Sequence, residues 1–318
     1  MTDLEFGSRM HPDLYPFYAQ TLGAEKAVTF SAEGSPLTRM DHNLVLEFDV
    51  SAEIVYIPVS EETPDVKTFI FRPEKLLPNA PAILYYHGGG YSNTNPEAYS
   101  HWCCLYANEL GAVVVCPDYR KAPENPYPAA LEDGIAVLNW MAANTENLGV
   151  DPERIAVAGP SAGGGLTIAT CLYVRDFGGP KIAFQMPLYP TMDDRLETRS
   201  SHEILYEGLL CRSVCENIWD MYLGEGHKER EIPVYASPSR CRDYSGLPPC
   251  YTYVGNLDPH RDETIAYCQQ LYDDGVIVSY SVYEGCFHGF DLMAHDQAKI
   301  ADMATEVSLY TIKTALHI

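Results

Sequence analysis

The chain has 318 residues, enough for one large domain with a small attached cap, and its hydrophobic content of 46% excludes a disordered protein. Its formal net charge of −23 repels phosphate backbones and anionic membrane surfaces, which disfavours nucleic-acid binding. No run approaches the roughly 20 apolar residues that span a bilayer, and no basic segment followed by an apolar run marks a secretory signal. Ten cysteines without paired CxxC spacing indicate reduced thiols, so we expect a cytoplasmic location.

Short apolar, β-branched runs alternate with longer helical patterns along the chain, and this order predicts an α/β fold. We expect strands at Glu53–Ile57, Lys67–Phe71, Ala82–Tyr86, Ala112–Cys116, Arg154–Ala158, Ile182–Pro187, Cys250–Val254 and Val278–Tyr283. We expect helices at Pro96–Leu110, Pro128–Asn144, Ala162–Arg175, Arg261–Asp274 and Gln297–Leu316. The pattern is typical of a mostly parallel eight-stranded sheet flanked by helices.

Two segments do not fit this alternation. Residues 1–45 precede the first strand, and residues 191–235 form a polar insertion between two strands. Open α/β sheets bind ligands at the carboxyl ends of their strands, so we expect both segments to form a helical cap there. Residues 46–190 and 236–318 then make up the main domain.

The strongest local motif is Gly-Pro-Ser-Ala-Gly at residues 159–163, between a predicted strand and a predicted helix. A sharp turn at this point exposes the hydroxyl of Ser161 as a nucleophile and aims a helix N-terminus at a developing oxyanion. By itself the pattern occurs in roughly a tenth of chains this long, so its position carries the argument. The alternative is a glycine-rich turn in which Ser161 only caps the helix.

A second motif, His-Gly-Gly-Gly at residues 87–90, directly follows a predicted strand. The backbone amides of Gly88 and Gly89, with that of Ala162, are the predicted oxyanion hole. A phosphate-binding loop is disfavoured because no lysine follows, unlike in a P-loop.

Two further residues follow later strands and complete a candidate triad. Asp258 comes after the strand at Cys250–Val254, and His288 comes after the last strand. The order Ser, Asp, His is that of α/β-hydrolases, although either residue alone is more often structural. Asp262 is the competing acid. No HExxH pattern or similar cluster indicates a metal site, and the chemistry of these residues needs no cofactor.

Together these segments resemble the hormone-sensitive lipase family of α/β-hydrolases, especially its bacterial esterase members. The matching residues are Tyr86-His87-Gly88-Gly89-Gly90-Tyr91, Pro117–Glu124, Pro126–Ala130, Glu132-Asp133, Ser237-Pro238, Leu247–Pro249, Asp258-Pro259, Arg261–Glu263 and His288–Phe290. The resemblance implies Ser161 as nucleophile, His288 as general base and acid, and Asp258 as the orienting carboxylate. One departure is Pro160, where the family usually has an acidic residue.

The expected activity is that of a serine carboxylesterase that hydrolyses small-molecule esters with short acyl chains through an acyl-enzyme. Amide or lactone hydrolysis on the same triad remains an alternative. A small-ligand receptor is disfavoured because the receptors of this fold have lost the histidine that this chain retains at position 288. A homodimer through the last strand or its helix is a further expectation from the resemblance.

Overall fold

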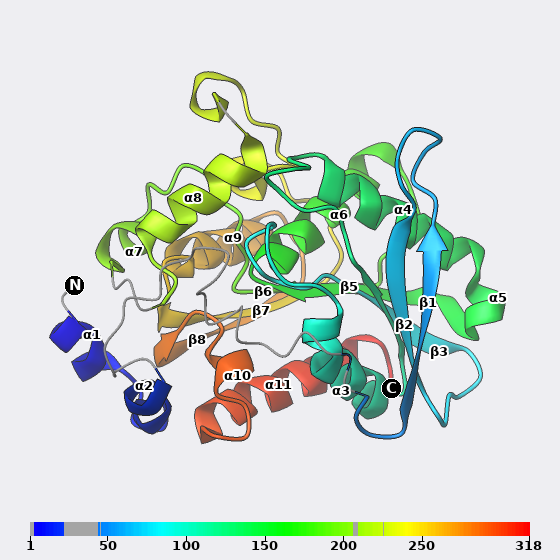
Figure 1. The fold of residues 1–318 in the computed structure, drawn as a ribbon, viewed down its shortest axis with the longest axis horizontal. Coiled ribbons are helices and arrows are strands. Elements are labelled where there is room, and N and C mark those ends of the chain that lie inside the picture. The colour runs from blue at the N-terminus through cyan, green and yellow to red at the C-terminus, as the bar shows by residue number, and fades with distance from the viewer. Residues whose placement is uncertain (1–2, 22–43, 45, 206–208, 225) are drawn as a thin grey trace.

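The computed structural model describes residues 3–21, 44, 46–205, 209–224 and 226–318, and their strands form one twisted sheet (Figure 1). The strands are β1 (Val50–Ile57), β2 (Val66–Pro73), β3 (Ala80–Tyr85), β4 (Val113–Pro117), β5 (Val150–Pro160), β6 (Phe184–Leu188), β7 (Cys250–Leu257) and β8 (Val278–Phe287). Their spatial order is β1-β2-β4-β3-β5-β6-β7-β8. Strand β2 is antiparallel to both of its neighbours, and every other pair is parallel.

Helices cover both faces of the sheet. The α-helices are α1 (Asp3–Arg9), α2 (Tyr15–Thr21), α3 (Ser100–Leu110), α4 (Ala129–Ala143), α5 (Thr145–Leu148), α6 (Ala162–Phe177), α7 (Arg199–Glu203), α8 (Arg212–Leu223), α9 (Arg261–Asp273), α10 (Phe290–Met293) and α11 (Lys299–Ala315). Short 3-10 turns are found at Glu97–Tyr99, His227–Glu229 and Pro238–Arg240. In Figure 1, α3 and α11 lie on one face of the sheet, and α4, α6 and α9 lie on the other.

Several inner strands are buried from end to end. Every residue of β3, β4 and β6 is buried, which explains why β3 and β4 are continuous apolar runs rather than alternating ones. The edge strands β1 and β8 are mostly half-buried or exposed, with buried residues at both ends of β1 and at the C-terminal end of β8. All eight predicted strands and all five predicted helices are confirmed, with boundaries shifted by a few residues.

The topology brings the predicted motifs to one end of the sheet. Strands β3 and β5 are adjacent and parallel, so the loop at 87–90 and the turn at Ser161 leave the sheet side by side. The parallel strands β7 and β8 deliver Asp258 and His288 at the same end. This is the edge at which open parallel sheets place their ligands.

The 191–235 insertion packs over this edge, as seen at the top of Figure 1. The ring of Tyr222 in α8 stacks on Tyr91, with centroids 3.8 Å apart, and the side chain of Ile218 lies against Gly90. The N-terminal segment reaches the same edge, where His11 N–H donates to Gly285 O and Phe17 stacks on Phe287. The rest of the predicted N-terminal cap, residues 22–43 and 45, lies outside the described residues.

The sequence analysis did not resolve the helices within the insertion. In α8 the buried residues are Val214, Cys215, Ile218, Trp219, Tyr222 and Leu223, a spacing of three to four that marks one apolar helix face. Polar residues between them hid this signal. Within the described part of the chain, no helix has both the length and the apolar character required to cross a bilayer.

Candidate active site

Ser161 stands on a strained turn between β5 and α6. Its backbone has φ 57° and ψ −120°, a conformation that L-residues rarely adopt, and its N–H donates to Leu188 O at 2.9 Å. A Cβ atom on Gly159 or on Gly163 would collide with the carbonyl oxygen of Tyr86. The two glycines of the motif are therefore required by the close approach of β3, β5 and α6 around the serine.

A chain of short hydrogen bonds connects Ser161 to His288 and Asp258. Oγ of Ser161 lies 2.9 Å from Nε2 of His288, and Nδ1 of His288 lies 2.7 Å from Oδ2 of Asp258. Asp258 is fully buried, whereas the His288 side chain retains 12% of its accessible surface. The arrangement places a base next to a hydroxyl and a carboxylate behind the base.

The charge on Asp258 is stabilised by its neighbours. Burial alone would raise the pKa of this carboxyl, but the facing His288 and a backbone hydrogen bond from His260 (2.8 Å) outweigh it and lower the pKa below its ordinary value. The competing acid Asp262 points elsewhere. It accepts from Arg261 Nε at 2.7 Å and from Ser200 N at 2.8 Å.

The glycine loop after β3 is held by hydrogen bonds and ring packing. The ring of His87 stacks on Tyr119 with centroids 4.1 Å apart, and the hydroxyl of Thr94 donates to Gly88 O at 2.6 Å. Gly89 adopts φ +110°, which favours glycine. Burial raises the pKa of the Tyr99 hydroxyl, and the neighbouring backbone of Gly88 partly offsets that rise.

The loop faces the first turn of α6. Ala162 is the first residue of that helix, and the first N–H groups of a helix have no partner within it. The Ala162 amide can therefore donate to an oxygen atom near Ser161, as the first amides of a helix do when they bind an anion.

Comparison with known proteins places this geometry in a family. A family model described as alpha/beta hydrolase fold matches residues 83–292. "Carboxylesterase NlhH" and "Esterase LipI" from Mycobacterium tuberculosis are both 35% identical to the chain. The first alignment covers 80% of this chain and 79% of the relative, and the second covers 75% and 74%. The solved structure titled "Bacterial Heroin Esterase" is 34% identical, with a TM-score of 0.86 over 97% of this chain and 98% of that one.

The chain belongs to the α/β-hydrolase family. These relatives confirm the resemblance to the bacterial esterase branch of the hormone-sensitive lipases.

In this α/β-hydrolase, Pro160 replaces the acidic residue expected before the nucleophile. It is the last residue of β5, where it pairs with Leu188 of β6. Its ring packs against Gly88, since a Cβ built on Gly88 would lie 3.6 Å from Pro160 Cγ. An apolar contact thus supports the glycine loop at this point, and the Ser161 turn retains its geometry.

Two functional neighbours escaped the sequence analysis. Oγ1 of Thr191 lies 3.4 Å from Ser161 Oγ, and the His260 ring packs edge-on against His288 with centroids 5.3 Å apart. Thr191 comes three residues after the end of β6, so its closeness to Ser161 depends on the parallel pairing of β5 and β6. His260 carried a signal in the sequence, because it is a second histidine two residues after Asp258.

Two groups among the described residues hold enough ligand atoms for a metal ion: Asp258, His260 and His288, and separately His295, Asp296 and Asp302. In the first group the ring nitrogens of the two histidines already contact protein atoms. In the second, Nδ1 of His295 faces Asp302 at 3.2 Å. The absence of a metal requirement stays a prediction.

Proposed function

We propose that Ser161, His288 and Asp258 are the catalytic triad of this enzyme and that it hydrolyses esters with short acyl chains. The α/β-hydrolase is a carboxylic ester hydrolase, as its relatives indicate. The observation that carries the assignment of roles is the continuous path from Ser161 Oγ through both nitrogens of His288 to Asp258, with separations of 2.9 and 2.7 Å.

The first half of the reaction forms an acyl-enzyme. Ser161 Oγ attacks the ester carbonyl carbon while Nε2 of His288 takes its proton, and the carbonyl electron pair moves onto oxygen. Collapse of this intermediate breaks the bond to the alcohol oxygen, which leaves with the proton from His288. Asp258 holds the imidazole in the tautomer that exposes Nε2 and stabilises its positive charge. In the second half, His288 activates water to release the acid.

We further propose that the amides of Gly89, Ala162 and Gly88 hold the oxyanion. Each donor in such a site typically contributes a factor of about 10²–10³ to the rate. The positive φ of Gly89 and the position of Ala162 at the start of α6 support the first two.

Segments 1–45 and 191–235 are proposed to cap the pocket of the catalytic domain formed by residues 46–190 and 236–318. The contacts of α8 with the glycine loop, and of the N-terminal segment with Gly285 and Phe287, support this division. A cap that covers the strand ends limits the length of acyl chain that fits, which favours short esters.

Hydrolysis of p-nitrophenyl esters from acetate to decanoate tests the proposal. We expect activity that is highest on the short chains and that Ser161→Ala abolishes in a folded protein. A matched amide, p-nitroacetanilide, separates esterase from amidase activity. Activity that survives Ser161→Ala, or that rises with chain length to decanoate, would contradict the proposed nucleophile or the proposed substrate class respectively.

A homodimer and a cytoplasmic location complete the proposal. Exposed apolar side chains on β8 and α11 support a contact between copies through the sheet edge: Tyr280, Val282, Met303, Val307 and Tyr310. None of the ten cysteines forms a disulfide, which fits a reducing compartment. Sedimentation of the purified protein tests the dimer, and a single species at 35 kDa would contradict it.

A further inference from the structure

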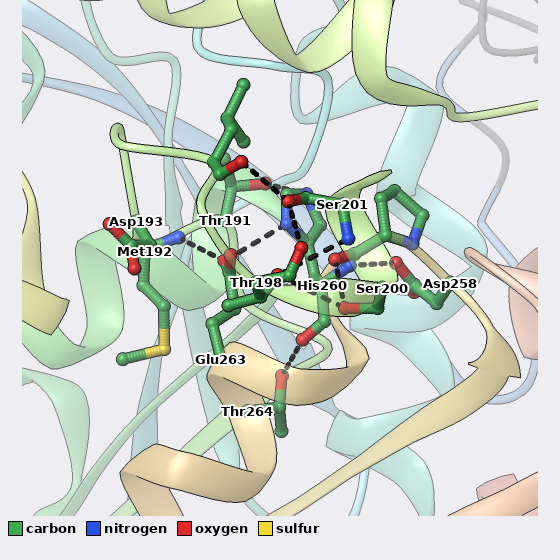
Figure 2. Close-up of polar contacts among 12 residues, drawn as sticks. Thr191, Met192, Asp193, Thr198, Ser200, Ser201, Asp258, His260, Glu263 and Thr264 are labelled. Atoms are coloured by element: carbon green, nitrogen blue, oxygen red, sulfur yellow. Dashed lines mark hydrogen bonds and ion pairs between the residues drawn. The ribbon is translucent and has the colours of Figure 1, made fainter. Parts of the chain in front are cut away.

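A second histidine–carboxylate pair lies one side chain away from the nucleophile. Thr191 Oγ1 is 3.4 Å from Ser161 Oγ. The same oxygen is 3.1 Å from Nε2 of His260 (Figure 2). Nδ1 of His260 in turn lies 3.0 Å from Oε1 of Glu263. Thr191 and His260 are completely buried and Glu263 is 1% exposed, so protein atoms alone determine the hydrogen bonds of this cluster.

The burial of Glu263 determines how many protons the pair holds. Oε1 accepts from Met192 N at 3.1 Å, but Oε2 has no hydrogen-bond partner among the described residues. A buried carboxylate with a bare oxygen is costly unless a proton or a cation neutralises it. Burial raises the pKa of Glu263 to about 7 although His260 opposes the shift. Burial lowers the pKa of His260, but the nearby Glu263 and Cys215 reverse the direction and raise it well above its ordinary value.

The shared proton sets the direction of the hydrogen bond to Thr191. If the proton is on Nδ1, His260 is a cation and Nε2 also carries a hydrogen. If the proton is on Glu263, the neutral imidazole accepts it at Nδ1 and again carries its own hydrogen on Nε2. In both forms Nε2–H donates to Thr191 Oγ1. Only the fully deprotonated pair turns its single N–H toward Glu263 and leaves Nε2 bare.

Because Thr191 Oγ1 accepts from His260, its own hydrogen is available to another acceptor. Ser161 Oγ is the acceptor that it faces, at 3.4 Å. Ser161 then uses a lone pair toward Thr191, and its hydrogen points at Nε2 of His288, 2.9 Å away. That is the orientation from which His288 removes the proton as Ser161 attacks.

We propose that Thr191, oriented by the buried His260–Glu263 pair, is a positioning residue that directs the hydroxyl proton of Ser161 toward His288. The inference rests on the proposed function, since it assigns a second support to the same nucleophile.

The backbone around His260 holds its ring in place for this role. The His260 N–H donates to Asp258 Oδ1 at 2.8 Å. The hydroxyl of Ser200, in α7, donates to the carbonyl oxygen of Pro259, the residue before His260, at 2.8 Å (Figure 2). One loop thus carries both the carboxylate that orients His288 and the imidazole that orients Thr191.

Titratable groups from several elements face the pair. Asp258 and His288 contact His260 from the ends of β7 and β8. Cys215 of α8 contributes to the raised pKa of His260, and Asp193 contributes to the raised pKa of Glu263. None of these residues reaches Thr191 through a hydrogen bond given for the described part of the chain. The threonine hydroxyl is thus the hydrogen-bonded route from the His260 side chain to Ser161, while the His260 ring also packs against that of His288.

The experiment is a double-mutant cycle on kcat/KM for p-nitrophenyl acetate, which reports the steps up to acylation. Thr191→Val removes the hydroxyl and keeps the shape, and Thr191→Ser restores it. Glu263→Gln keeps an acceptor for Met192 N–H but cannot share a proton with His260. The matched control is Thr264→Val, a buried threonine of α9 whose hydroxyl meets the His260 carbonyl and not its ring. Urea unfolding confirms that each variant is folded.

We expect Thr191→Val and Glu263→Gln each to lower kcat/KM about five- to tenfold, the effect of one buried hydrogen bond. KM stays nearly constant, Thr191→Ser retains activity, and Thr264→Val matches the wild type. In the double variant the two effects do not multiply, because Glu263 acts through the Thr191 hydroxyl.

The inference is overturned if Thr191→Val matches the wild type, if the loss lies in KM alone, or if the two substitutions multiply. Ester hydrolysis that Ser161→Ala abolishes is measured first, so these results reject the positioning role while the proposed function stands. If Thr191→Val does not fold, Thr191→Ala takes its place in the cycle.

Discussion

Two histidine–carboxylate pairs lie beside Ser161, and they differ in contact and in access to solvent. His288 touches the serine hydroxyl directly and keeps some exposed surface, while its partner Asp258 is buried. His260 and Glu263 are both buried and reach the serine only through Thr191. A general base must exchange protons with substrate and water, which only the first pair can do. A fully enclosed pair holds its protons and can only orient a neighbour.

The largest expected effect is the loss of kcat when the Asp258 carboxylate is replaced. We expect Asp258→Asn to lower kcat about 10⁴-fold, because the amide favours the wrong tautomer of His288. Asp262→Asn is the matched control, since Asp262 binds Arg261 and Ser200 rather than a histidine. Steady-state kinetics on p-nitrophenyl acetate measures both. An equal loss of kcat in Asp258→Asn and Asp262→Asn would contradict the proposal that Asp258 is the acid of the triad.

The smaller expected effect is on the free energy of unfolding, whose pH dependence should come largely from the buried His260–Glu263 pair. Above pH 6.5 the unfolded chain has released the protons of His260 and Glu263, whereas the folded pair, with both pKa values raised, retains one. The stability from the pair therefore falls as pH rises: the part from Glu263 is lost between pH 4.5 and about 7, and the part from His260 is complete below pH 6.5 and is lost as pH rises through its raised folded pKa. Urea unfolding at pH 6.5, 7.5 and 8.5 measures the slope.

Glu263→Gln is the control for this slope, because its neutral histidine partner has no shared proton to lose. The variant should lose less stability than the wild type between pH 6.5 and 8.5. Equal slopes in the two proteins would mean that the folded pair does not hold its proton, and the direction assigned to the Thr191 hydrogen bond would lose its basis.

The triad and its sheet were predictable because each residue comes directly after a strand. Parallel strands bring the residues at their carboxyl ends to one edge, so Ser161, Asp258 and His288 could be placed together from the order of elements alone. The role of the glycines at 159 and 163 could also be predicted, because a turn this tight leaves no room for a side chain at either position.

The rest depended on contacts between segments that no local pattern specifies. The close approach of the Tyr99 hydroxyl to Gly88 requires the 3-10 turn at Glu97–Tyr99 to fold back on the glycine loop. The link from Ser161 to His260 requires Thr191, which lies 30 residues along the chain from the serine, in the loop after β6. Polar side chains in such places look like ordinary loop residues until the tertiary structure brings them together.

The most direct test of the difference between the two pairs is the rate at which a fluorophosphonate labels Ser161, with the labelled residue located by peptide mapping. We expect one phosphonyl group on Ser161 in the wild type, a rate lowered at least about 10⁴-fold in His288→Ala, and a loss of about tenfold or less in His260→Gln. A label on another residue, or equal losses in the two histidine variants, would contradict the account.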